Sequence, residues 1–98
     1  KDSKLLEEAG VFSIVLECIE SSLAKKITKT LNIPTIGIGA SVDCDGQILV
    51  TDDLIGLNNI SARFIKQYAN INKQINSAVL KYKKEVIKSK FPKKKHSY

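Results

Sequence analysis

The sequence contains no methionine and no tryptophan, and it has two cysteines, two prolines and one histidine among 98 residues. No stretch approaches the roughly 20 apolar residues of a membrane span, and the amino end lacks the zones of a signal peptide, so we expect no membrane contact. Cys18 and Cys44 have neither CxxC spacing nor histidine partners for zinc, which predicts free thiols in a reducing cytosol. Because the chain opens at Lys1 without an initiator methionine, we expect one partial domain of a larger protein.

Acidic residues are scarce at the carboxyl end. Residues 81–98 hold eight lysines and one glutamate, a charge of +7, whereas residues 1–80 carry −1. This lysine-rich end has no arginine and no interleaved base-stacking aromatics, so it is more typical of a solvated helix end and tail than of a nucleic-acid site. We therefore predict no nucleic-acid partner.

The hydrophobic pattern of residues 1–57 predicts an α/β fold with a parallel sheet. A helix over residues 2–9 ends at Gly10, and residues 11–17 form a strand that the pattern predicts to be buried on both faces. Ser21 or Ser22 caps a second helix, whose apolar residues recur every three or four positions up to Leu31. Two further strands follow, over residues 34–39 and 47–50, which completes a βαβ-loop-β order.

Residues 58–90 are predicted to contain the terminal helices, and residues 91–98 form a tail. One or two long helices over residues 61–90 would place eight apolar side chains on one stripe: Phe64, Tyr68, Ile71, Ile75, Ala78, Val79, Tyr82 and Val86. We expect this stripe to pack against the chain's own core, and a partner subunit is the alternative.

Glu17 is the candidate catalytic residue, because it closes the first apolar strand. Catalytic groups of parallel α/β sheets collect at the carboxyl ends of the strands. The second strand ends nearby with Gly37 and Gly39, which permit close approach to the backbone. These glycines do not form a phosphate-binding loop, since no lysine and no helix follow directly. The alternative for Glu17 is a solvated rim side chain or a cap of the next helix.

Five motifs occur along the chain: GVFSIVLECI, IPTIGIGAS, DGQILVTDDLIGL, RFIKQYA and FPKKKHSY. In order and spacing they resemble the carboxyl-terminal part of the ketopantoate hydroxymethyltransferase family. The resemblance implies a (β/α)8 TIM barrel of the phosphoenolpyruvate/pyruvate superfamily, in which this chain supplies the sixth to eighth strands and the terminal helices. It also implies a cytoplasmic homo-oligomer. Three positions depart from the family pattern, namely Ser41, Asp52 and Ala62.

The resemblance further implies a reaction, the transfer of a hydroxymethyl group from methylene-tetrahydrofolate to 3-methyl-2-oxobutanoate with magnesium, which yields ketopantoate for pantothenate biosynthesis. By position, Glu17 matches the family's proton acceptor, which removes the C3 proton of the keto acid so that the enolate attacks the folate-borne methylene. A carboxylate can act as such a base when burial brings its pKa closer to neutrality. The magnesium ligands lie in the missing amino-terminal half. We expect Asp43, Asp45, Asp52 and Asp53 to make local hydrogen bonds instead.

The expected activity requires the amino-terminal half of the barrel, which this chain does not contain. Alone, the chain should be inactive, and the open edges of a half-barrel should cause aggregation, oligomerisation or complementation by the other half. An inactive half-barrel that serves as a structural or oligomerisation module is the alternative function. A related barrel enzyme for another keto acid is disfavoured, because the DGQILV and HS(Y) segments resemble the ketopantoate branch in particular.

Overall fold

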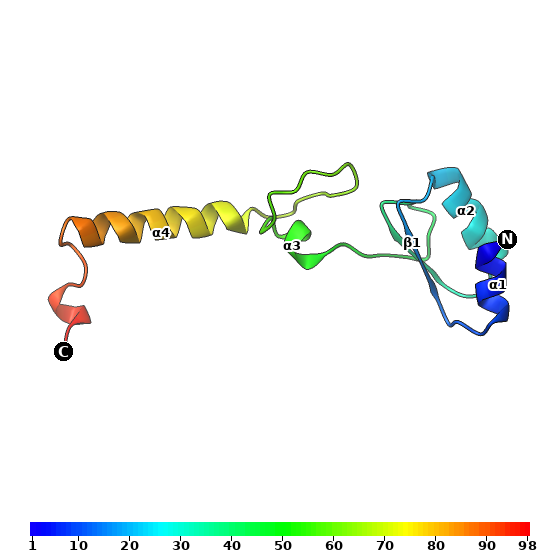
Figure 1. Ribbon diagram of the computed structural model, residues 1–98, viewed down its shortest axis with the longest axis horizontal. Helices are drawn as coiled ribbons and strands as arrows, with labels where there is room; N and C mark the ends of the chain where they lie inside the picture. The colour runs from blue at the N-terminus through cyan, green and yellow to red at the C-terminus, as the bar shows by residue number, and fades with distance from the viewer.

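The computed structural model describes residues 1–98 and is elongated, with principal extents of 67 × 28 × 16 Å. Figure 1 shows the sheet and its flanking helices at the amino-terminal end and a long helix at the other end, and the segment between them carries a short helix and a folded-back loop. The helices are α1 (Asp2–Glu8), α2 (Ser21–Thr30), α3 (Thr51–Leu54) and α4 (Ile71–Ile87), and a 3-10 turn spans Lys94–His96. The sheet and its core therefore lie at the amino-terminal end, and Asp53 and Gly56 are buried separately around α3.

The predicted α/β class with a parallel sheet is confirmed. The sheet has the order β1-β2-β3, and all neighbours are parallel. Ile14 pairs with Thr35 and Glu17 with Ile38, so β1 and β2 end at the same edge. The third strand is shorter than the predicted 47–50 and begins one residue earlier. The strands are β1 (Ile14–Glu17), β2 (Thr35–Ile38) and β3 (Gly46–Gln47).

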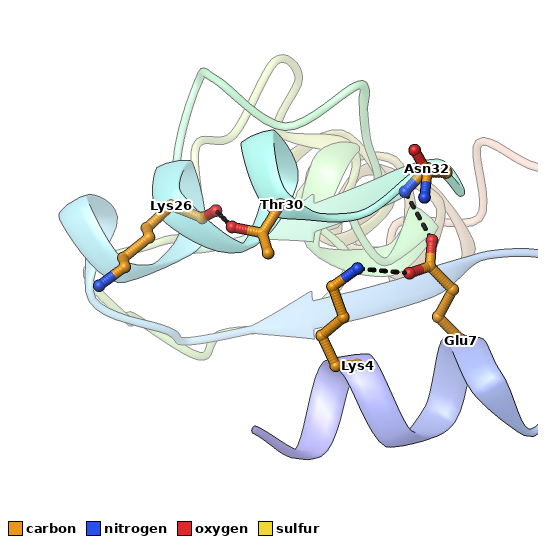
Figure 2. Close-up of polar contacts among 5 residues, drawn as sticks. All are labelled: Lys4, Glu7, Lys26, Thr30 and Asn32. Atoms are coloured by element: carbon orange, nitrogen blue, oxygen red, sulfur yellow. Dashed lines mark hydrogen bonds and ion pairs between the residues drawn. The ribbon is translucent and has the colours of Figure 1, made fainter.

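A carboxylate of α1 contacts the segment that follows α2. Glu7 accepts hydrogen bonds from the backbone N–H of Asn32 and, at 3.3 Å, from Lys4 Nζ (Figure 2). The Asn32 bond lowers the pKa of Glu7 below 4.5. Gly10 follows α1 with φ +94°, the left-handed conformation that glycine adopts without strain, and this turns the chain into β1 as predicted.

The amino end of α2 is capped by Glu20, and the prediction that Ser21 or Ser22 is the cap was wrong. Glu20 Oε1 accepts from Ser22 N at 3.0 Å, and Oε2 accepts from Leu23 N at 3.1 Å and from the Ser22 hydroxyl. The longer glutamate side chain reaches back to the free N–H groups of the first turn. The hydroxyl bond is the main cause of the lowered pKa of Glu20.

Acidification is expected to weaken both contacts. Because the pKa values of Glu7 and Glu20 fall below 4.5 on folding, their stabilising effect is present above that pH and is lost as pH falls through the folded values. Thermal unfolding followed by circular dichroism should show a lower Tm for Glu20→Gln than for the parent chain at pH 7, and a smaller difference at a pH below the ordinary pKa of a glutamate. Glu8→Gln, on the exposed side of α1, is the control and should leave Tm unchanged. An equal effect of Glu20→Gln at both pH values would contradict this assignment.

The core lies between the sheet and α2. Its buried residues are Ile14, Leu16, Ala24, Leu31 and Cys44. The other face of β1 is uncovered, since Val15 is 54% exposed, so the prediction of a strand buried on both faces was wrong. Alternate residues of a strand point to opposite faces, and only one face has a helix over it here. The β1 part of that face therefore has no cover, whereas Ile38 of β2, which pairs with Glu17, is buried.

The carboxyl-terminal half also differs from expectation. Residues 58–70 contain no helix, because their backbone instead bonds to α3 and to the turn after it, with Tyr68 N donating to Leu54 O at 2.8 Å. Asn70 caps α4 by accepting from Lys73 N at 3.0 Å, which sets the start of the helix. Phe64 therefore lies in a loop and not on the helical stripe.

The helix α4 buries none of its residues, so the expected packing of its stripe against the chain's own core was wrong. Ile75, Val79 and Tyr82 are each at least half exposed. The physical reason is visible in Figure 1, where α4 projects away from the sheet. Its only aromatic partner is Phe91 of the tail, whose ring centroid lies 5.5 Å from that of Tyr82. None of the helices combines the length and apolarity that a bilayer crossing requires.

Candidate active site

Glu17 lies at the carboxyl edge of the sheet, as the sequence predicts. It is the last residue of β1, and the next backbone N–H, that of Cys18, donates to Ile38 O at 2.9 Å and so fixes the strand end against β2. Alternation places Glu17 with Val15 on the face opposite the core. Its side chain is exposed, so this chain alone does not supply the burial that a catalytic carboxylate base requires.

Both strands that form this edge end in the left-handed region. Cys18 has φ +52° after β1, and Gly39 has φ +61° after β2. The conformation is uncommon for a residue with a side chain, and residues held in it cluster at functional sites. The chain thus turns sharply where the loops after β1 and β2 begin.

A hollow of about 630 Å³ lies at this edge. It is bounded by the loop after β1, the start of α2, the loop after β2, and a turn of the later chain. Glu17 itself directly precedes the hollow and is not part of its wall. The lining residues are Cys18, Ile19, Glu20, Ser21, Gly39, Ala40, Arg63 and Phe64.

The hollow brings in two residues that sequence reasoning did not assign to a site, Arg63 and Phe64. They form the centre of a turn closed by Ile65 N donating to Ala62 O at 3.0 Å. They belong to the motif RFIKQYA, which the helical period places in a helix and the structure places in a turn. The available signal was composition, because Arg63 is the single arginine of the chain, beside fifteen lysines.

Phe64 packs directly over Gly39, and this contact leaves no room for a side chain at position 39. A Cβ at position 39 would lie 2.6 Å from Phe64 Cβ and would also need the left-handed conformation. Gly39→Ala should therefore lower the free energy of unfolding by more than the roughly 1 kcal/mol typical of strain alone. Gly10→Ala is the matched control, since Gly10 also has positive φ but has nothing within 4 Å. Equal losses of stability in the two variants, measured by thermal unfolding, would contradict the contact.

The four aspartates for which local hydrogen bonds were predicted make local contacts or lie exposed. Asp45 accepts from Thr35 N at 2.9 Å, and Asp53 is buried and accepts from Asn58 at 3.0 Å. Asp43 pairs with Lys25 at 3.3 Å, and Asp52 is exposed. The chain contains no group of three His, Cys, Asp or Glu side chains that could hold a metal ion. The residues present therefore do not fit a magnesium site.

Ser41, one of the three positions that depart from the family pattern, also forms local hydrogen bonds. It is buried, its Oγ donates to Asp43 Oδ2 and accepts from Asp43 N, each at 3.2 Å, and its carbonyl accepts from Gln47 at 2.6 Å. These bonds restrain the loop after β2 just beyond Ala40. Ser41 thus shapes the approach to the hollow without lining it.

Comparisons with known proteins agree with the motifs. The sequence model of ketopantoate hydroxymethyltransferase matches residues 1–94. The chain is 79% identical over its full length to the 3-methyl-2-oxobutanoate hydroxymethyltransferase of Pelagibacter ubique, and it spans 38% of that protein. It is 51% identical to the enzyme of that name from Moorella thermoacetica and 48% identical to that from Syntrophus aciditrophicus, and it spans 36% of each. The chain therefore belongs to the ketopantoate hydroxymethyltransferase family.

Proposed function

We propose that the chain is the carboxyl-terminal part of a (β/α)8 barrel, strands six to eight and the terminal helices, that converts 3-methyl-2-oxobutanoate to ketopantoate with methylene-tetrahydrofolate. Its relatives carry the name of that hydroxymethyl transfer, and the chain spans only 38% of the Pelagibacter protein. The activity would accordingly require residues outside this chain. In this proposal magnesium is also held there, and this chain gathers no group of three His, Cys, Asp or Glu side chains that could hold it.

The position of Glu17 is the observation that carries the proposal. A carboxylate ends a strand whose neighbour ends at the same edge, beside a hollow large enough for a ligand. In parallel α/β proteins this edge is where reacting groups gather. Glu17 is the carboxylate of β1 on the uncovered face, so its side chain points to the side where the remaining strands of a barrel would close.

The proposed chemistry for Glu17 is proton abstraction. The carboxylate takes the proton from C3 of the keto acid, and the electron pair of the C–H bond moves toward the neighbouring keto group to form the enolate. That enolate carbon then forms a C–C bond to the folate-borne methylene. Water supplies the hydroxyl oxygen, and the bond between the methylene and the folate nitrogen breaks, which releases tetrahydrofolate. Closure of the barrel over Val15 and Glu17 would remove water from the carboxylate, and a desolvated carboxylate is the stronger base.

The exposed helix α4 favours a second candidate function, that of an inactive structural or oligomerisation module. Ile75, Val79 and Tyr82 form a solvent-exposed apolar stripe on a helix that buries none of its residues. Such faces mark protein interaction sites. In this alternative Glu17 would be a rim carboxylate without a catalytic role.

A chimera separates the two functions. Residues 1–98 would replace the matching segment of the Pelagibacter ubique protein, to which they are 79% identical. The enzyme proposal predicts that the purified chimera forms ketopantoate from 3-methyl-2-oxobutanoate and methylene-tetrahydrofolate at a rate close to that of the Pelagibacter protein. A folded chimera of native oligomeric size that forms no ketopantoate would instead support the structural module.

A further inference from the structure

The hollow at the strand ends contains one charged side chain that forms no ion pair within the chain. Arg63 lines it and forms no ion pair, since the two salt bridges of the chain are Lys4–Glu7 and Lys25–Asp43. Glu20 is the only carboxylate in the same wall. Both of its oxygens are already used in capping α2, through bonds to Ser22 and Leu23. The guanidinium is thus free to receive an anion.

The turn that carries Arg63 also presents an aromatic surface. Phe64 is its neighbour at the centre of the turn, packs over Gly39 and remains 36% exposed. A guanidinium offers paired N–H donors that match the geometry of a carboxylate, and an aromatic ring offers a flat surface for stacking. Together the two side chains suit a ligand that joins a flat ring to a carboxylate.

The size of the hollow favours the larger of the two substrates. Cavities that bind drug-sized ligands have volumes of roughly 300–1,000 Å³, and this hollow, which is open to solvent on one side, has a volume of about 630 Å³. The keto acid is far smaller than such a ligand. Methylene-tetrahydrofolate has the matching size, a flat pterin ring and the carboxylates of its glutamate tail.

We propose that Arg63 and Phe64 form the binding surface for the folate co-substrate, with Arg63 pairing with a glutamate carboxylate and Phe64 contacting a ring. This inference rests on the proposed function and adds residues to it. It places the folate beside the end of β2, while Glu17 at the end of β1 faces the keto acid. The arrangement brings the methylene donor and the enolate to one edge of the sheet.

The test uses the chimera and two assays. Arg63→Ala should raise the KM for methylene-tetrahydrofolate roughly tenfold, the effect expected from losing a charged hydrogen bond, with kcat little changed. Exchange of the C3 proton of the keto acid, measured without folate, should stay at the parent rate. Arg63→Lys keeps the charge and should recover most of the affinity. Lys26→Ala on the exposed side of α2 removes the same charge outside the hollow and is the control.

The remaining outcomes each decide the inference. An unchanged KM for the folate in Arg63→Ala overturns it, and so does a raised keto acid KM in folate-free exchange, which would assign Arg63 to the keto acid carboxylate. If Arg63→Ala does not fold, the salt dependence of the KM for the folate in the parent chimera tests the inference instead. Its folate KM should rise with salt concentration while exchange does not, and a salt-independent KM overturns the inference. Failure of the parent chimera to form ketopantoate at all would instead refute the proposed function.

Discussion

Glu17→Gln in the chimera is expected to abolish most of the hydroxymethyl transfer, with kcat lowered by roughly 10²–10⁴-fold, the range that general base catalysis contributes. Glutamine keeps the size and the hydrogen-bonding reach of the side chain but has no basic carboxylate. The KM values for both substrates should change little, because the proposed role concerns proton transfer and not binding. The measurement is a steady-state rate series for the parent chimera and the variant.

A matched control distinguishes loss of the base from loss of charge. Glu8→Gln makes the same chemical change at an exposed position of α1, outside the strand edge, and should leave the rate unchanged. Glu17→Asp should retain more activity than Glu17→Gln, since it keeps a carboxylate at a shorter reach. A Glu17→Gln variant with full activity would remove Glu17 from the mechanism.

The isolated chain is expected to associate with itself and to form no ketopantoate. Its uncovered surfaces are large: Phe12 is 88% exposed, Val15 54% and Val42 92%. The edge strand β3 also leaves backbone groups free to pair with another chain. Exposed apolar faces and open sheet edges both promote association between chains, so monomers should be a minor species.

Light scattering at increasing concentration measures this directly. The average mass should exceed that of one 98-residue chain and rise with concentration. Val15→Lys, on the uncovered face, should shift the distribution toward the monomer, whereas Lys26→Ala on α2 should not. Mixing the chain with the remaining part of the Pelagibacter protein should reduce self-association and restore transfer. A monodisperse, fully folded monomer would contradict the half-barrel account.

Local sequence patterns predicted the amino-terminal part of the fold well. The spacing of Ala24, Ile27 and Leu31 indicated α2, and Gly10 indicated the turn into β1. These signals depend only on neighbours within a few residues, so they predict local structure even when the rest of the fold is unknown. The parallel order followed because a helix separates β1 from β2.

Contacts distant in sequence explain what the patterns missed. An apolar run such as Val11–Leu16 indicates burial somewhere, but it does not say which chain supplies the cover, and here Val15 stays exposed. The stripe that included Phe64 fitted a helical period, yet hydrogen bonds from Tyr68 and Ile71 to the α3 region hold that segment in a loop. That loop places Arg63 at the hollow, which no local signal could show.

The role of Glu17 was predictable only as far as its place at the strand end. The register of β1 against β2 confirms that edge, and the capping of α2 by Glu20 shows that a different glutamate performs the structural task considered for Glu17. Whether Glu17 acts as a base depends on groups outside this chain. Its catalytic role is therefore a proposal that kinetics must test.

Exchange of the C3 proton of 3-methyl-2-oxobutanoate for deuterium, followed by NMR in the chimera without folate, is the most direct test of the central claim. It reports proton abstraction alone, separate from folate binding and transfer. The account predicts exchange in the parent chimera and in Glu8→Gln, and its loss by at least roughly 10²-fold in Glu17→Gln. Equal exchange in the parent and in Glu17→Gln would contradict it.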